Sequence, residues 1–249
     1  MKAGRVEELR LAFMLLSRLP ARNIRGEAPA LAASSWAWPL VGLVVGAIAA
    51  GACAFGLAVG LTPVMSALLA LSAMVLATGG LHEDGLADVA DGFGGGRDRA
   101  RKLEIMRDSR IGSYGVIALV LALAFRLFGI AALVEGQSAF AALIGLAAAS
   151  RAILPAALLL LPPARAEGLG HAATATDPAT ALVAAAIGLA CLLPLGLGVA
   201  LSVGFTIAVT AVLVAGIAVR QIGGQTGDVM GAMQQVTECA GWAVIVALL

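Results

Sequence analysis

Residues 38–60 read WPLVGLVVGAIAAGACAFGLAVG, a stretch without a charged side chain. A transmembrane helix needs about 20 mostly apolar residues, and this stretch meets that requirement. Working outward along the chain, similar apolar windows cover residues 64–81, 114–134, 139–161, 179–201 and 203–220, with a shorter one at 236–249. The sequence therefore predicts an all-α, polytopic membrane protein with about six to seven transmembrane helices.

The overall composition supports this class of protein. Of 249 residues, 61% are hydrophobic and only 12% are charged, and the mean hydropathy is +0.99. A soluble domain is about half apolar and a quarter charged, and a disordered chain is poor in aliphatic residues. An outer-membrane barrel would show short alternating segments instead of long apolar blocks. Nucleic acid is not an expected partner, because 16 basic residues nearly balance 15 acidic ones.

The polar segments are predicted to lie on one side of the membrane. Residues 1–30 form a basic arm in which residues 5–19, with apolar and charged side chains interleaved, favour a helix on the membrane surface. Residues 82–113 are also rich in arginine, and two spans separate them from the arm, so the positive-inside rule places both in the cytoplasm. Continued alternation makes the loops 162–178 and 221–235 cytoplasmic as well. The opposite side receives tight turns near Thr62, Gln137 and Ser202. The whole chain, residues 1–249, is expected to be one integral-membrane domain.

The acidic stretch of residues 79–96, GGLHEDGLADVADGFGGG, is the first candidate for chemistry. On a helix, Asp84, Asp88 and Asp91 fall within an arc of about 60°. Three adjacent carboxylates resist ionisation unless a cation lies among them, and hard oxygen ligands favour magnesium or manganese. His82 faces the opposite side if the helix includes it. The alternative is a solvated acidic helix end. Such an end does not require that the three aspartates share one face of the helix, or that so many glycines surround them.

The next stretch, residues 97–112, reads RDRARKLEIMRDSRIG. Its first half, residues 97–102, is equally compatible with an ordinary positive-inside loop and with a surface that binds an anionic substrate. Arg107 and Arg110 differ, because they alternate with Asp108 and Ser109 directly before a glycine and a span. Guanidinium groups beside a carboxylate cluster would balance the charge of a pyrophosphate substrate.

Two further features carry polar groups into or between spans. Residues 223–232, GGQTGDVMGA, form a Gly-rich island that includes Thr226 and Asp228 and is either a ligand loop or a connector. Arg126 and Arg151 lie near the middle of their spans, where a charge costs roughly 2.5–3.5 kcal/mol. Both are therefore expected to face the bundle interior or a polar cavity, either as structural counter-ions or as ligands of an anionic substrate.

Taken together, these motifs resemble the cobalamin synthase family. The resemblance rests on HEDGLAD at residues 82–88, on Asp91-Gly92 and on LEIMRDSRIG at residues 103–112. It continues in LSRLP at residues 16–20, WPLVG at 38–42, Ser150-Arg151, ARAEGLG at 164–170 and the island 223–232. It thus spans nearly the whole chain in the same order. One small departure is Ser17, where many members carry threonine.

The resemblance implies an adenosylcobinamide-GDP ribazoletransferase, which transfers adenosylcobinamide phosphate to α-ribazole or its 5′-phosphate and releases GMP. Magnesium is the implied cofactor. The expected metal ligands are Asp84, Asp88, Asp91 and Asp228. The expected catalytic residues are Asp91, His82, Arg107 and Arg110. Asp91 is preferred to His82 as general base, because it lies on the helix face that carries the other aspartates. The expected substrate-binding residues are Arg151, Arg165, Asp108, Ser109 and Thr226.

Alternatives and partners complete the hypothesis. Other enzymes with aspartate clusters at span ends are the CDP-alcohol phosphotransferases and the membrane prenyltransferases. The non-enzyme alternative is a cation-coupled transporter, but transporters place ionisable groups near the midplane, whereas these acids gather at one border. The expected partners are the small-molecule substrates and the lipid bilayer of the cell inner membrane. Association with a second copy or with other corrinoid-pathway enzymes is left open.

Overall fold

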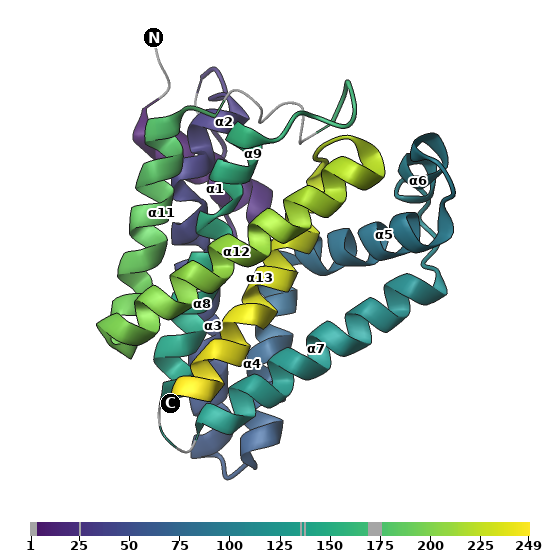
Figure 1. The fold of residues 1–249 in the computed structure, drawn as a ribbon. Coiled ribbons are helices and arrows are strands. Elements are labelled where there is room, and N and C mark those ends of the chain that lie inside the picture. Colours follow the sequence, from purple (N-terminus) through teal and green to yellow (C-terminus); the bar gives the residue numbers. More distant parts are fainter. Residues whose placement is uncertain (1–3, 25, 135, 137, 169–175) are drawn as a thin grey trace.

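A computed structural model describes residues 4–24, 26–134, 136, 138–168 and 176–249 of the chain. This part is helical throughout and contains no named strand, only one isolated bridge between Pro163 and Gln225. In chain order (Figure 1), the helices are α1 (Arg5–Leu16), α2 (Leu31–Ser34), α3 (Trp38–Ala58), α4 (Pro63–Thr78), α5 (Leu81–Gly95), α6 (Arg99–Ile105), α7 (Ser113–Val134), α8 (Ser138–Ala152), α9 (Leu154–Leu160), α11 (Pro178–Leu192), α12 (Leu197–Ile222) and α13 (Gly227–Leu248), with short 3-10 turns η1 (Ser35–Ala37) and η2 (Leu193–Leu195).

The protein is a multi-pass helical membrane protein. Among the described residues, five helical segments are long and apolar enough to cross a bilayer. A sixth span results if α4 and α5, which are bent by 87° at their junction, are counted as one. The predicted range of six to seven is thus met only at its lower end. The predicted span at residues 236–249 is the second half of α13, whose first half carries polar side chains and which is not among the five.

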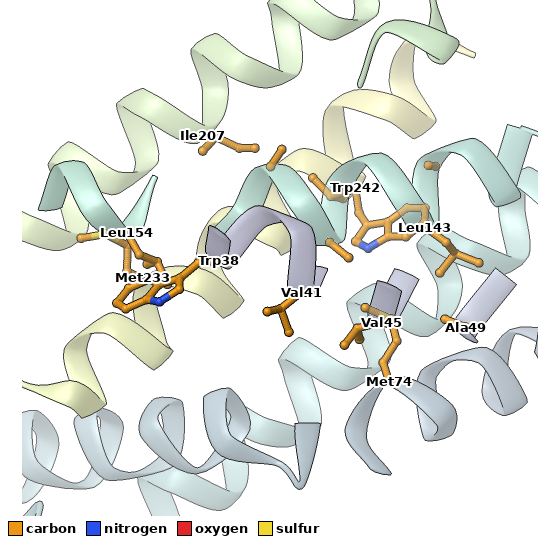
Figure 2. Packing of buried hydrophobic residues seen from close by; sticks show 14 of the residues in the cluster. Trp38, Val41, Val45, Ala49, Met74, Leu143, Leu154, Ile207, Met233 and Trp242 are labelled. Atoms are coloured by element: carbon orange, nitrogen blue, oxygen red, sulfur yellow. The ribbon is translucent and has the colours of Figure 1, made fainter. Parts of the chain in front are cut away.

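The bundle is built around a close contact between α3 and α8. A Cβ atom added at Gly42 would lie 2.2 Å from the carbonyl oxygen of Ala147, and one at Gly46 would lie 2.5 Å from that of Leu143. Such small residues allow membrane helices to approach at backbone distance. Figure 2 shows Val41 and Val45 of α3 in the core that this contact creates. Helix α13 runs through the middle of the molecule and packs on α5, α7, α8 and α12 (Figure 1).

The break between α4 and α5 redirects the chain at the point where it becomes acidic. Gly79 and Gly80 both adopt left-handed backbone conformations, with φ of 68° and 72°, which favour glycine. Gly79 also leaves room for the side chain of Arg18, which a Cβ atom would meet at 2.4 Å. Helix α5 consequently turns away from α4, and it is not one of the five helices that are long and apolar enough to cross a bilayer (Figure 1).

Two predicted connections are wrong. The turn expected near Ser202 lies at residues 193–196, where Pro194 follows the end of α11 and Gly196 has φ of 95°. The expected loop 221–235 is reduced to residues 223–226, because the Thr226 side chain accepts a hydrogen bond from the Val229 amide and starts α13 there.

Other predicted connections and the arm have different outcomes. The turn near Thr62 is confirmed, and this residue caps α4. The helix expected within residues 5–19 is confirmed as α1, whereas its location on the membrane surface stays a prediction. Residues 1–3, 25, 137 and 169–175, which belong to the predicted arm, turn and third polar loop, lie outside the described residues.

The α3–α8 contact predicts a difference between two glycines of the same helix. Gly46→Ala should lower the stability of the protein by roughly 1–3 kcal/mol, because the added methyl group has no room. Gly51→Ala, where a Cβ atom meets nothing within 4 Å, should be neutral or slightly stabilising. Thermal unfolding in detergent measures both variants, and equal melting temperatures would contradict the close contact.

Candidate active site

The candidate site forms where the first turn of α13 packs against α5. The two helices touch at glycines: a Cβ atom at Gly85 would lie 2.8 Å from the carbonyl oxygen of Asp228, and one at Gly231 would lie 3.3 Å from Cα of His82. This approach brings Asp84 and Asp88 of α5 to the same region as Asp228. Three of the four predicted metal ligands are therefore neighbours, although they come from segments far apart in the sequence.

A backbone pairing adds Arg165 to these carboxylates. The Ala164 amide donates to the carbonyl oxygen of Gln225 at 2.8 Å, and the Gln225 amide donates to that of Pro162 at 2.8 Å. Gly224 makes the pairing possible, because a Cβ atom there would lie 2.0 Å from the Pro162 oxygen. Arg165 Nη1 then lies 3.4 Å from Asp228 Oδ2. Sequence reasoning assigned Arg165 only by resemblance, since this pairing leaves no local signal.

Asp88 has the most perturbed carboxyl group of the cluster, because it is partly buried and lies among other aspartates. Burial, followed by the charges of Asp84, Asp228 and Asp91, raises the pKa of its carboxyl group from 3.8 to about 7, while Arg165 opposes the shift. Among the described residues, no three His, Cys, Asp or Glu side chains form a ready-made metal-ligand set. The cluster thus has the oxygen donors that a hard divalent cation prefers, but it is not arranged as a closed metal site.

Asp91 has a different environment from the other aspartates. Its Oδ2 accepts a hydrogen bond from the Gly112 amide at 2.7 Å, and its Oδ1 accepts one from the Gly115 amide at 2.9 Å. Both donors belong to the start of α7, and a Cβ atom at either glycine would lie 2.4 Å from an Asp91 oxygen. In this structure Asp91 holds the N-terminus of α7, and its predicted roles as metal ligand and general base stay predictions.

The remaining predicted residues around α5 separate into two groups. Arg107 lies close enough to Asp228 and Arg165 to affect the pKa of both. Arg110 instead binds Asp108 at 2.7 Å on the surface, with 86% of its side chain exposed, and this partner lowers the pKa of Asp108 to about 2. Ser109 is exposed in the same turn. The structure therefore brings Arg107, but not this exposed turn, to the carboxylates.

Thr226 and His82 both lie beside the cluster. The Thr226 hydroxyl donates to Asp228 Oδ2 at 3.2 Å, so the residue that caps α13 also holds this carboxylate. His82 is only 2% exposed, and among the described residues neither of its ring nitrogens has a hydrogen-bond partner.

The two mid-span arginines face the interior, as predicted. Arg126 is 1% exposed and forms ion pairs with Glu83 at 2.9 Å and Glu238 at 3.0 Å. Arg151 is 2% exposed and donates to the carbonyl oxygen of Ala147 in its own helix at 2.8 Å. The structure thus places Arg151 inside the bundle, and its predicted contact with substrate stays a prediction.

Two cavities flank the acidic cluster and share Asp84. The first, with a volume of about 120 Å³, reaches Asp228 and extends among apolar side chains of α1, α3 and α9. The second, of about 550 Å³, lies beside the α4–α5 junction, and Arg18 and Thr78 are among the residues that line it. Sequence reasoning missed both the apolar cavity and Arg18 as a site residue, although Arg18 lies in the LSRLP motif that carried part of the resemblance.

Comparison with known proteins shows the family of the chain. The family model described as cobalamin-5-phosphate synthase matches residues 8–246. The chain belongs to the cobalamin-5-phosphate synthase family. The match includes α5, the start of α13 and all the polar segments between them.

Curated relatives resemble the chain over nearly their full length. A protein of Mesorhizobium japonicum is 46% identical over 94% of this chain and 91% of its own. A protein of Bradyrhizobium diazoefficiens is 45% identical over 94% and 90%. One of Xanthobacter autotrophicus is 45% identical over 98% and 94%. All three are named adenosylcobinamide-GDP ribazoletransferase. No solved structure matches the chain.

The raised pKa of Asp88 makes the stability of this cobalamin-5-phosphate synthase family member depend on pH. The ionised carboxylate is less favourable in the folded protein than in the unfolded chain, so the destabilisation grows as pH rises from 3.8 and is complete above about 7. At pH 8, metal-free Asp88→Asn should therefore be more stable than the wild type and unfold at a higher temperature. The gain in the free energy of unfolding should be roughly 1 kcal/mol after allowance for solvent screening.

The gain should shrink at pH 5, where the wild-type carboxyl group is mostly protonated. Thermal unfolding with a chelator present measures both values, and Glu27→Gln, at an exposed position, is the control. A gain that is equal at the two pH values would show that Asp88 ionises normally.

Proposed function

We propose that the protein is an adenosylcobinamide-GDP ribazoletransferase. It transfers adenosylcobinamide phosphate to a ribose hydroxyl of α-ribazole or its 5′-phosphate, forms adenosylcobalamin or its 5′-phosphate, and releases GMP. The family membership and the relatives' shared name support the reaction. The observation that carries it is the meeting of Asp84, Asp88 and Asp228 with Arg165 between two cavities. A transporter or a prenyltransferase-like enzyme has no comparable support.

We infer that the aspartates bind Mg²⁺ during this reaction. The carboxyl groups of Asp84, Asp88 and Asp228 meet at this point, and the guanidinium groups of Arg165 and Arg107 lie close to Asp228. A pyrophosphate would add further negative charge, so without a cation it would be repelled. The carboxylate oxygens suit magnesium, which completes its coordination with water and substrate phosphates. Bound there, magnesium would neutralise charge that develops on the phosphate oxygens.

The protein's own groups then position the reactants. Arg165 and Arg107 provide guanidinium groups for the phosphate oxygens, and Thr226 holds Asp228 by its hydroxyl group. Phosphoryl transfer depends mainly on such positioning and charge stabilisation, with the entering and leaving oxygens in line. Two cavities that share Asp84 allow donor and acceptor to approach the phosphorus from different sides.

Release of GMP tests the proposal directly. Purified protein given adenosylcobinamide-GDP, α-ribazole and Mg²⁺ should form GMP and the cobalamin product in equal amounts. Arg165→Met should lower kcat/KM by a factor of about 100 or more, because a partly buried guanidinium group that contacts the reacting phosphate is lost. Arg110→Met should change it by less than threefold, because Arg110 binds Asp108 on the surface. Equal losses in the two variants would refute the placement of the site.

We further propose that the protein lies in the cell inner membrane with the acidic cluster in the cytoplasm, where nucleotide substrates are found. A variant with Cys53, Cys191 and Cys239 replaced by alanine and Arg97→Cys introduced should not react with an impermeant maleimide in intact cells, but should react after the membrane is opened. Efficient labelling in intact cells would reverse the orientation.

A further inference from the structure

The cavity that reaches Asp84 and Asp228 is lined mainly by apolar side chains. Leu15 and Leu16 of α1 form one side, and Leu154 and Leu158 of α9 form another. Trp38, at the start of α3, completes the wall, and Figure 2 shows it beside Leu154. The charged groups of the cavity, Asp84 and Asp228, belong to the acidic cluster. The cavity is thus an apolar chamber whose polar edge is the candidate active site.

Two side chains of this chamber are buried polar groups without partners. Trp38 is 4% exposed and His82 is 2% exposed, and both line the cavity. Among the described residues, neither the indole nitrogen of Trp38 nor either ring nitrogen of His82 forms a hydrogen bond. A buried donor without an acceptor costs free energy, so unpartnered groups beside a cavity indicate a ligand that bears an acceptor atom.

We propose that this chamber binds the aromatic base of the acceptor nucleoside, with the Trp38 indole N–H donating to the unsubstituted ring nitrogen of that base. The assignment rests on the proposed function. The base of α-ribazole, a dimethylbenzimidazole, is flat and apolar and has one free acceptor nitrogen. Guanine carries several donors and acceptors that leucine side chains cannot satisfy, and the corrin ring, which bears amide side chains, is too large for a cavity of about 120 Å³.

The position of the chamber fits the direction of the reaction. A base held between α1, α3 and α9 directs its ribose toward Asp84 and Asp228, which border the same cavity. The second cavity, with Arg18 and Thr78, lies beside the same Asp84 and is left for the anionic donor. Acceptor specificity is therefore assigned to the apolar chamber, and donor binding to the cavity that contains an arginine.

Removal of a single N–H group tests the hydrogen bond. Trp38→Phe should raise the KM for α-ribazole roughly three- to tenfold, as expected for loss of one hydrogen bond, and leave the KM for adenosylcobinamide-GDP unchanged. The control is Trp36→Phe, because Trp36 donates to Glu8 at 2.7 Å and does not line the cavity; it should change neither KM.

A substrate analogue identifies the atom. The α-riboside of dimethylindole replaces the acceptor nitrogen by a C–H group, so the wild type should use it with a higher KM than α-ribazole. In Trp38→Phe this difference should disappear, because the partner of the nitrogen is gone. A difference that persists in full, or a rise in the KM for adenosylcobinamide-GDP instead, would overturn the proposal.

A second pair of variants covers the case in which Trp38→Phe fails to fold. Leu158→Ala enlarges the chamber and should raise the KM for α-ribazole about tenfold, whereas Leu160→Ala, at a side chain 77% exposed on the same helix, should not. Equal KM values in these two variants would also overturn the proposal.

Direct binding separates this inference from the proposed reaction. Calorimetric titration of α-ribazole into the wild type and Trp38→Phe needs no turnover. Wild-type protein that releases no GMP but binds α-ribazole more tightly than Trp38→Phe does would refute the reaction and support the chamber. Release of GMP together with equal binding of α-ribazole to both proteins would support the reaction and refute the chamber. If the wild type neither releases GMP nor binds α-ribazole, both the reaction and the chamber are refuted.

Discussion

The position of the active site depends on the charge of Arg126, which must be paired inside the bundle. Its guanidinium group bonds Glu83 of α5 at 2.9 Å, Glu238 of α13 at 3.0 Å and Gln235 at 2.8 Å. An unpaired charge at this depth is costly, and loss of one partner from a buried pair is more destabilising than the pair is stabilising. Arg126 therefore ties α7 to both helices that carry the acidic cluster, and it fixes which face of α5 turns inward.

Helix α5 is consequently held at two places. Glu83 is bound to Arg126 near its start, and Asp91 is bound to the amides of Gly112 and Gly115 near the start of α7. Between these anchors, the side chains of Asp84 and Asp88 form no hydrogen bond or ion pair with other described residues. The acidic residues of α5 thus fall into two groups: Glu83 and Asp91 stabilise the fold, and Asp84 and Asp88 keep carboxylate groups without such partners. The pKa of Asp88 is raised there, first by burial and then by the charges of the neighbouring aspartates.

Much of this arrangement could be predicted from residues that are close together in the sequence. Apolar length predicted the spans, and helical spacing predicted the helix that carries Asp84, Asp88 and Asp91, because both depend only on neighbouring residues. The start of α13 also had a local signal, since Thr226 followed by Asp228 is a typical helix start, but the glycines around it favoured a loop. The capping role of Asp91 and the pairing of Ala164 with Gln225 had none, because each joins residues that are distant in the sequence.

The contacts of Arg165 bear on the proposed binding of a cation and a phosphate at this site. Its guanidinium group is held by the Leu103 carbonyl oxygen at 3.1 Å, whereas its contact with Asp228 is longer, at 3.4 Å. The backbone of residues 162–165 is fixed independently by the pairing with Gln225. The position of Arg165 therefore does not depend on Asp228. If a cation binds the carboxylate of Asp228, the guanidinium group of Arg165 would stay in place but lose its counter-charge on α13. Its N–H groups would then be free to bind a phosphate. Cation and anion binding at this site should thus reinforce one another.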